Sequence, residues 1–146
     1  MISVGDVMTR DLVTVQETDD VALAESLLKM GRFRHLPVVR DGQVVGLVTA
    51  RDILRAGLAG RPAARGVHLA EIMTRDPVTV APRASLVSAA RTMLDQKYGC
   101  LPVCEPGGDL VGILTEADFV RFAADVVHDL DLVSEAVHAT ASGPAA

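Results

Sequence analysis

The chain contains one nine-residue phrase twice, and no other feature constrains its fold as strongly. VMTRDLVTV at residues 7–15 returns as IMTRDPVTV at residues 72–80, 65 positions later and with seven of nine residues identical. The phrase is not of low complexity, so chance is a poor explanation. Two copies are too few for a solenoid, and the duplication therefore predicts two small units packed on each other.

The duplication continues beyond this phrase. LPV at residues 36–38 aligns with LPV at residues 101–103, and VGLVTARD aligns with VGILTEAD after one inserted residue. The inserted residue lies in a predicted turn, which is RDGQ in the first copy and EPGGD in the second. Surface turns tolerate an extra residue. The expected boundaries are a first repeat at 1–58, a linker at 59–68, a second repeat with an extended C-terminal helix at 69–138, and a frayed tail at 139–146.

Each copy predicts the order strand, helix, strand, strand, helix. The first helix is expected to begin at a cap on Thr18 or Asp19 and to end near Lys29, before the stop signal Gly31. The other elements of the first copy are strands at 12–15, 35–39 and 44–49 and a helix from Thr49 to about Leu58. Those of the second are strands at 78–80, 100–104 and 110–114 and helices at about Ser85–Gln96 and from Thr115. This alternation indicates an α/β or α+β fold with helices on one face of each sheet.

Composition limits the classes of partner. Aromatic residues make up only 3 % of the chain, so aliphatic side chains must build the core. The net charge of −5 and the lack of stacking aromatics disfavour a nucleic-acid partner, although eight of the 14 basic residues lie between Lys29 and Arg65. No secretory signal opens the sequence and no apolar run reaches the roughly 18 residues of a membrane span. We therefore expect a cytoplasmic protein with no membrane partner.

No catalytic or metal-binding constellation emerges. The histidines are scattered, and nothing pairs a nucleophile with a base, so an enzyme is the least favoured class. Cys100 and Cys104 share one predicted strand, where their Cα atoms would lie roughly 13 Å apart, beyond the ~7 Å reach of a disulfide. We expect buried thiols, and neither a metal nor a cofactor.

The motif Thr-x-x-Asp follows each predicted hairpin, at residues 49–52 and 115–118, and has two interpretations. In the first it is a capping box, with Thr as the helix N-cap and Asp accepting the backbone N–H of the cap. In the second, the helix N-terminus attracts phosphate and the carboxylate accepts two hydrogen bonds from a ribose diol. The two interpretations do not exclude each other.

The ordered set of motifs, present twice, resembles tandem CBS domains over roughly residues 4–54 and 69–122. The resemblance implies a stand-alone pair of β-α-β-β-α repeats, packed with pseudo-twofold symmetry, that is not an enzyme. Such pairs often dimerise, and their clefts commonly bind AMP, ADP, ATP, NAD-type dinucleotides or S-adenosylmethionine. The ligand would serve energy sensing or other regulation of an unidentified effector protein, and would be a regulatory ligand, not a cofactor.

The resemblance also implies a role for individual residues. Asp52 and Asp118 would hold the ribose, and Thr49 and Thr115 would meet the phosphate or ribose. The adenine slot would be lined by Leu12, Val13, Pro77 and Val78, with an apolar wall from His35, Leu36, Pro37, Cys100, Leu101 and Pro102. Arg51 would assist with phosphate, and Arg34 would lie at one of the clefts.

The second copy departs from the first in charge. Ala117 stands where the first copy has Arg51, Gly99 where it has Arg34, and Glu116 adds a negative charge. We therefore expect the Asp52 cleft to prefer phosphorylated adenosine, and the Asp118 cleft to be empty or to take a ligand with less negative charge.

The predicted C-terminal helix carries an apolar stripe. Its members recur at intervals of three or four: Phe119, Phe122, Val126, Leu130, Val133 and Val137. The stripe could pack on its own module or join a homodimer interface, and we expect a homodimer. The main alternative to a ligand sensor is a structural dimerisation module with empty clefts.

Overall fold

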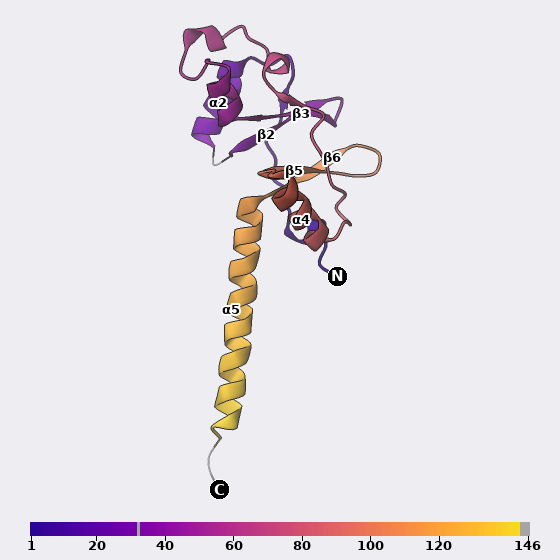
Figure 1. Ribbon diagram of the computed structural model, residues 1–146, viewed down its shortest axis with the longest axis vertical. Coiled ribbons are helices and arrows are strands. Elements are labelled where there is room, and N and C mark those ends of the chain that lie inside the picture. The colour runs from indigo at the N-terminus through magenta and orange to yellow at the C-terminus, as the bar shows by residue number, and fades with distance from the viewer. Residues whose placement is uncertain (32, 144–146) are drawn as a thin grey trace.

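The structure is a computed structural model that describes residues 1–31 and 33–143. Its first half contains α1 (Val4–Val7), β1 (Val15–Gln16), α2 (Val21–Met30), β2 (His35–Arg40), β3 (Gln43–Thr49) and α3 (Ala50–Arg55). The short 3-10 helices η1 (Pro62–Ala64) and η2 (Leu69–Glu71) lead to β4 (Thr74–Arg75), α4 (Leu86–Gln96), β5 (Cys100–Cys104), β6 (Leu110–Thr115) and α5 (Glu116–Ala141). This is a mixed α+β fold of two repeats, as the sequence predicts, from which α5 projects as a long helix (Figure 1).

Each repeat is built around a β-hairpin. In the first, β2 and β3 pair antiparallel with Val38 opposite Gly46, and β1 adds in parallel to β2. In the second, β5 and β6 pair antiparallel with Val103 opposite Gly112. The two hairpins therefore place equivalent residues of the duplicated sequence in equivalent registers.

The N-terminal segments of the two repeats are exchanged between the structural units. β4, which belongs to the second repeat by sequence, pairs antiparallel with β3 of the first, where Arg75 lies opposite Gly46. Correspondingly, Thr9 pairs with Ile113 of β6 through two backbone hydrogen bonds of 2.9 Å. Each unit is thus completed by a segment of the other repeat, which the boundaries expected from the sequence do not anticipate.

A glycine in each hairpin permits this exchange. A Cβ atom on Gly46 would lie 2.5 Å from the sulfur of Met73, and one on Gly112 would lie 2.6 Å from the sulfur of Met8. Each Cβ atom would also lie 3.0 Å from a backbone carbonyl, that of Thr74 or Thr9, so any larger residue would require the exchanged segment to shift. The repeated Val-Gly dipeptide therefore marks the strand against which the other repeat docks.

The two hydrophobic cores follow the same exchange. The first core takes Leu69 and Met73 from the second repeat, together with Val15, Val21, Ala24, Leu36, Val38, Val48, Ile53 and Ala64. The second core takes Val4 and Met8 from the first repeat, together with Leu86, Ala89, Met93, Leu101, Val103 and Leu114. Both are built from aliphatic side chains, as the composition requires.

The helix caps agree with the sequence except at α2. Asp20 caps this helix by accepting the backbone N–H of Leu23 at 2.9 Å, so the expected cap at Thr18 or Asp19 was wrong by one or two residues. Asp19 instead accepts a backbone N–H within the preceding turn. α4 begins at Leu86 with Ser85 as its N-cap, within one residue of the expected start.

Three predicted elements are shorter than expected. The strand expected at residues 78–80 is reduced to a single parallel bridge between Val80 and Val103. The strand expected at residues 12–15 is reduced to β1 because residues 10–14 cross from the second unit, where Thr9 is paired, to the first, where Val15 pairs with Val38. The helix expected to reach Leu58 ends at Arg55. Gly57 adopts a φ of 72° just beyond it, a left-handed conformation that does not continue a helix.

α5 leaves the body of the molecule soon after its start (Figure 1). Phe119 and Phe122 pack against the second core. The later members of the stripe are exposed, by 39 % at Val126 and by about 60 % at Leu130, Val133 and Val137. Beyond Phe122 the stripe therefore does not pack on its own module, which corrects one of its two expected roles. The helix extends to Ala141, past the expected boundary at His138, and residues 144–146 of the expected frayed tail lie outside the described residues.

Candidate functional site

The first Thr-x-x-Asp motif forms the capping box that the sequence predicts. The backbone N–H of Thr49 donates to Oδ2 of Asp52 at 2.8 Å, and the Thr49 hydroxyl donates to the same oxygen at 3.1 Å. The backbone N–H of Asp52 in turn donates to Oγ1 of Thr49 at 3.3 Å. Asp52 thus commits one oxygen to the cap, while Oδ1 has no hydrogen-bond partner among the described residues. Asp52 itself is half-buried, so its carboxylate is not sealed in the core.

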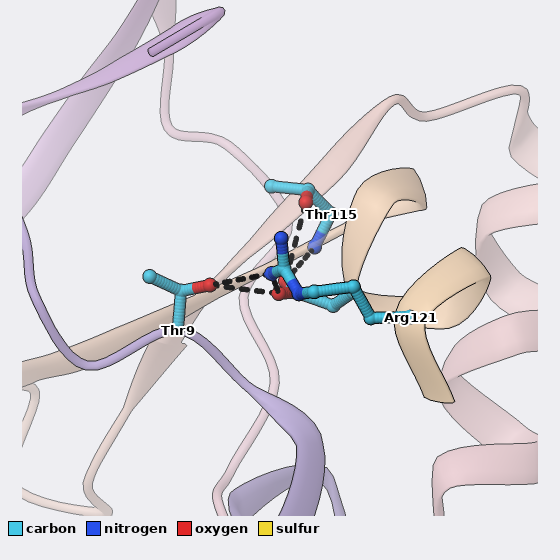
Figure 2. A network of polar contacts seen from close by, with 4 residues as sticks. Thr9, Thr115 and Arg121 are labelled. Carbon is cyan, nitrogen blue, oxygen red and sulfur yellow. Dashed lines mark hydrogen bonds and ion pairs between the residues drawn. The ribbon is translucent and has the colours of Figure 1, made fainter. Parts of the chain in front are cut away.

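The second motif is bonded more heavily, and its carboxylate is buried. Asp118 is 1 % exposed. Its Oδ2 accepts the backbone N–H of Thr115 at 2.8 Å and the Thr115 hydroxyl at 3.2 Å. Its Oδ1 accepts the hydroxyl of Thr9 at 2.7 Å and a guanidinium N–H of Arg121. Figure 2 shows Thr9, Thr115 and Arg121 converging on this point from the exchanged N-terminal segment, the end of β6 and α5.

His35 lies where the two repeats meet. A Cβ atom on Gly99 would be 3.0 Å from its Nε2. Burial lowers the pKa of His35 below its usual value of 6.5, opposed by Glu116 and Asp52 and assisted by Arg34. The ring is therefore neutral near pH 7. The proximity of Gly99 places His35 of the first repeat against the second repeat.

A pocket of about 220 Å³ spans both repeats. It is lined by Leu47, Thr74, Arg75, Asp76, Pro77, Val78, Tyr98 and Cys100. The pocket thus brings Pro77, Val78 and Cys100, three of the expected adenine-slot residues, together with β3 of the other repeat. Ligand pockets typically enclose roughly 300–1,000 Å³, so this pocket is smaller than a usual ligand site.

The remaining expected ligand residues are divided between cleft and core. Leu36 and Leu101 are at most 1 % exposed and belong to the two cores. Pro37 and Pro102 are also buried, Leu12 is half-buried, and Val13 packs against the first core. Arg34 and Arg51 are exposed. The expected apolar wall is therefore narrower than the sequence motif suggests.

Both thiols are free and buried, as predicted. Burial raises the pKa of Cys100 to about 12. Burial, with a smaller contribution from Asp109, also raises the pKa of Cys104. The thiolate is the reactive form of cysteine, so neither residue is suited to nucleophilic chemistry near neutral pH.

Two residues of the polar network were not identified from the sequence. Thr9 is part of the repeated phrase and Arg121 stands one turn after Asp118, and neither was assigned a role. The duplication itself could have pointed to both residues, because Thr9 and Thr74 occupy the same place in the two copies, as do Arg55 and Arg121. What the sequence does not reveal is the exchange of segments, which brings Thr9 to an aspartate 109 positions away.

In the part of the chain that the structure describes, no cluster of three or more His, Cys, Asp or Glu side chains is arranged to hold a metal ion. Over the same residues, no helix combines the length and the apolar character that a bilayer span demands.

The family of the chain follows from comparison with known proteins. A family model described as CBS domain matches it twice, at residues 4–59 and 69–125. The chain therefore belongs to the CBS-domain family and carries a tandem pair of these domains.

Solved structures of CBS pairs share its fold over most of its length. AcuB of Vibrio cholerae, a protein named for acetoin utilization, is 36 % identical with a TM-score of 0.80, covering 90 % of this chain and 96 % of that one. CBSX2 of Arabidopsis thaliana, in its complex with AMP, is 32 % identical with a TM-score of 0.78, covering 86 % and 98 %. The CBS pair of protein MJ0100, in complex with 5′-methylthioadenosine and S-adenosyl-L-methionine, is 27 % identical with a TM-score of 0.75, covering 86 % and 98 %.

Curated relatives of this chain are longer proteins. Homoserine O-acetyltransferase of Methanococcoides burtonii is 36 % identical over 120 residues, which are 82 % of this chain but 24 % of that enzyme. Inosine-5′-monophosphate dehydrogenase of Korarchaeum cryptofilum is 34 % identical over 109 residues, which are 75 % of this chain but 22 % of that enzyme. The chain spans about a quarter of the length of these relatives, so the similarity concerns a segment of each.

Proposed function

We propose that this chain is a non-enzymatic regulatory module that binds an adenosine nucleotide between its two CBS repeats and signals to a separate partner. The observation that carries the proposal is the state of Asp52. One of its oxygens serves the helix cap, and the other has no hydrogen-bond partner among the described residues, on a side chain that is only half-buried. A carboxylate held in this way can accept a ribose diol without losing the cap that positions it.

The charge around the first cleft favours a phosphorylated ligand. Arg51 directly precedes Asp52 on α3, and Arg34 is close enough to His35 to lower its pKa. Guanidinium contacts to phosphate are charge-assisted and roughly twice as strong as neutral hydrogen bonds. The solved CBS pairs that hold AMP, 5′-methylthioadenosine or S-adenosyl-L-methionine support an adenosine ligand as the chemical class.

The exposed stripe of α5 supports a role in assembly. Several aliphatic side chains in a row are left in contact with water, which is unfavourable for an isolated chain. We propose that the protein forms a homodimer that covers this stripe, and that a cytoplasmic effector protein reads the ligand-dependent arrangement of the two repeats.

A thermal-shift screen of AMP, ADP, ATP, NADH and S-adenosylmethionine tests the proposal. A ligand that binds only the folded state adds about 2.7 kcal/mol at a hundred times its Kd. We expect at least one of these compounds, AMP first among them, to raise the melting temperature in a concentration-dependent manner.

The alternative function is a structural dimerisation module. It is favoured by one observation, the completeness of the two capping boxes, which give both aspartates a purely structural role. A flat response to every compound in the screen, from a protein that is dimeric by light scattering, would support this alternative and exclude the sensor.

A further inference from the structure

The buried carboxylate of Asp118 has no room for a ligand in the observed arrangement. A carboxylate offers about four lone-pair sites. Four donors occupy them here: the backbone N–H and hydroxyl of Thr115, the hydroxyl of Thr9 and the guanidinium of Arg121. A ribose diol needs two acceptor positions, so it can reach Asp118 only if Thr9 and Arg121 leave Oδ1.

The first cleft has equivalent residues, but they do not form the same hydrogen bonds. Thr74 and Arg55 occupy the places of Thr9 and Arg121 in the duplicated sequence. In the described part of the chain, Asp52 is bonded through its side chain to Thr49 alone. The duplication therefore supplies the same residue types around both aspartates, but only the carboxylate of Asp118 has all its acceptor positions occupied.

We propose that Arg121 and Thr9 form an internal latch on Asp118 that closes the second cleft to ribose while the first cleft stays open. The inference rests on the proposed adenosine site at Asp52 and adds the reason why the two clefts differ. The latch acts in addition to the charge difference, in which Ala117 stands in place of Arg51. The closing group comes from α5 itself, one turn after Asp118.

Release of the latch requires little rearrangement of the fold. The side chain of Arg121 is 65 % exposed, so its guanidinium can turn into water without opening the core. Thr9 is held through its backbone pairing with Ile113, which does not depend on its hydroxyl. Ligand entry would therefore change contacts at two places, the exchanged N-terminal segment and the first turns of α5. Because the rest of α5 extends away from the module (Figure 1), the second cleft is the one connected to the exposed helix.

Calorimetric titration of the full chain with AMP tests the latch. We expect the parent to bind one AMP per chain, and Arg121→Ala to gain a second site through an affinity increase of about tenfold to a hundredfold at that cleft. The matched control Arg55→Ala, the same change in the other copy, should keep one site. Thr9→Val, which removes the hydroxyl at nearly constant volume, should give a smaller gain than Arg121→Ala. The melting temperature of each variant checks that it is folded.

The outcomes separate the latch from the proposed function. One AMP site in the parent, unchanged in both Arg121→Ala and Thr9→Val, would overturn the latch and leave the Asp52 site standing. No site in the parent but one in Arg121→Ala would support the latch and contradict the open first cleft. Binding in neither protein would overturn both.

Discussion

Replacing Asp52 by asparagine separates the two roles of this residue, because it changes the charge with little change in shape. The side-chain carbonyl of asparagine can take the place of Oδ2 and keep accepting the backbone N–H of Thr49, now seen at 2.8 Å. The NH₂ group then occupies the place of Oδ1. A lost cap costs about 1 kcal/mol, so the free energy of unfolding without ligand should fall by no more than that.

Ligand binding should respond much more strongly to the same change. The NH₂ group would face the ribose diol where the carboxylate accepted it. Hydrogen bonds to a charged group contribute about 1.5–3 kcal/mol, so affinity for AMP should drop roughly tenfold to a hundredfold. The assay is calorimetric titration paired with urea unfolding of the same samples. Asp118→Asn is the matched control. It should destabilise the fold, because Asp118 is buried among four donors, and leave the affinity of the first cleft intact. Undiminished AMP affinity in Asp52→Asn would show that Asp52 is not the ribose ligand.

Three further predictions follow from the fold. Gly46→Ala places a Cβ atom against Met73 and should lower the free energy of unfolding in urea by about 1–3 kcal/mol. Gly107→Ala, which has open space around it, should leave this free energy nearly unchanged. Equal effects of the two changes would refute the close approach at Gly46. Because burial lowers the pKa of His35 from 6.5, the unfolded chain binds a proton more readily, so stability is retained above about pH 6.5 and decreases as the pH falls below it. Urea unfolding at pH 7 and 5.5 should show a smaller decrease for His35→Gln than for the parent, and an identical decrease would contradict this assignment. Leu130 is 61 % exposed in the single chain, so Leu130→Glu should leave the ligand-free fold intact. It should convert the dimer to a monomer, as measured by light scattering. A persistent dimer would exclude this part of the stripe from the interface.

Local patterns in the sequence predict most of the elements of each repeat. The alternation of apolar residues, the turn at Asp41–Gly42 and the caps Thr49 and Thr115 all depend on neighbours within a few positions, and the structure confirms them. The two capping boxes were predictable for the same reason, since Thr and Asp stand three residues apart on one helical turn.

The exchange of N-terminal segments could not be predicted from local patterns. Whether Met8 packs in its own repeat or in the other depends on where residues 10–14 cross, and the duplicated sequence fits either arrangement equally well. The polar network at Asp118 depends on that exchange, because Thr9 reaches it only from the other repeat. The course of α5 is likewise undetermined by its stripe, since an apolar face specifies that a partner is needed but not which one.

A crystal structure of the full chain with AMP would test most directly whether the first cleft is an adenosine site. We expect AMP between the repeats with its ribose hydroxyls about 2.7 Å from Oδ1 of Asp52, the Thr49 cap intact, and Asp118 still bonded to Thr9 and Arg121. AMP bound with its ribose away from Asp52, or clefts left empty at saturating AMP, would contradict it.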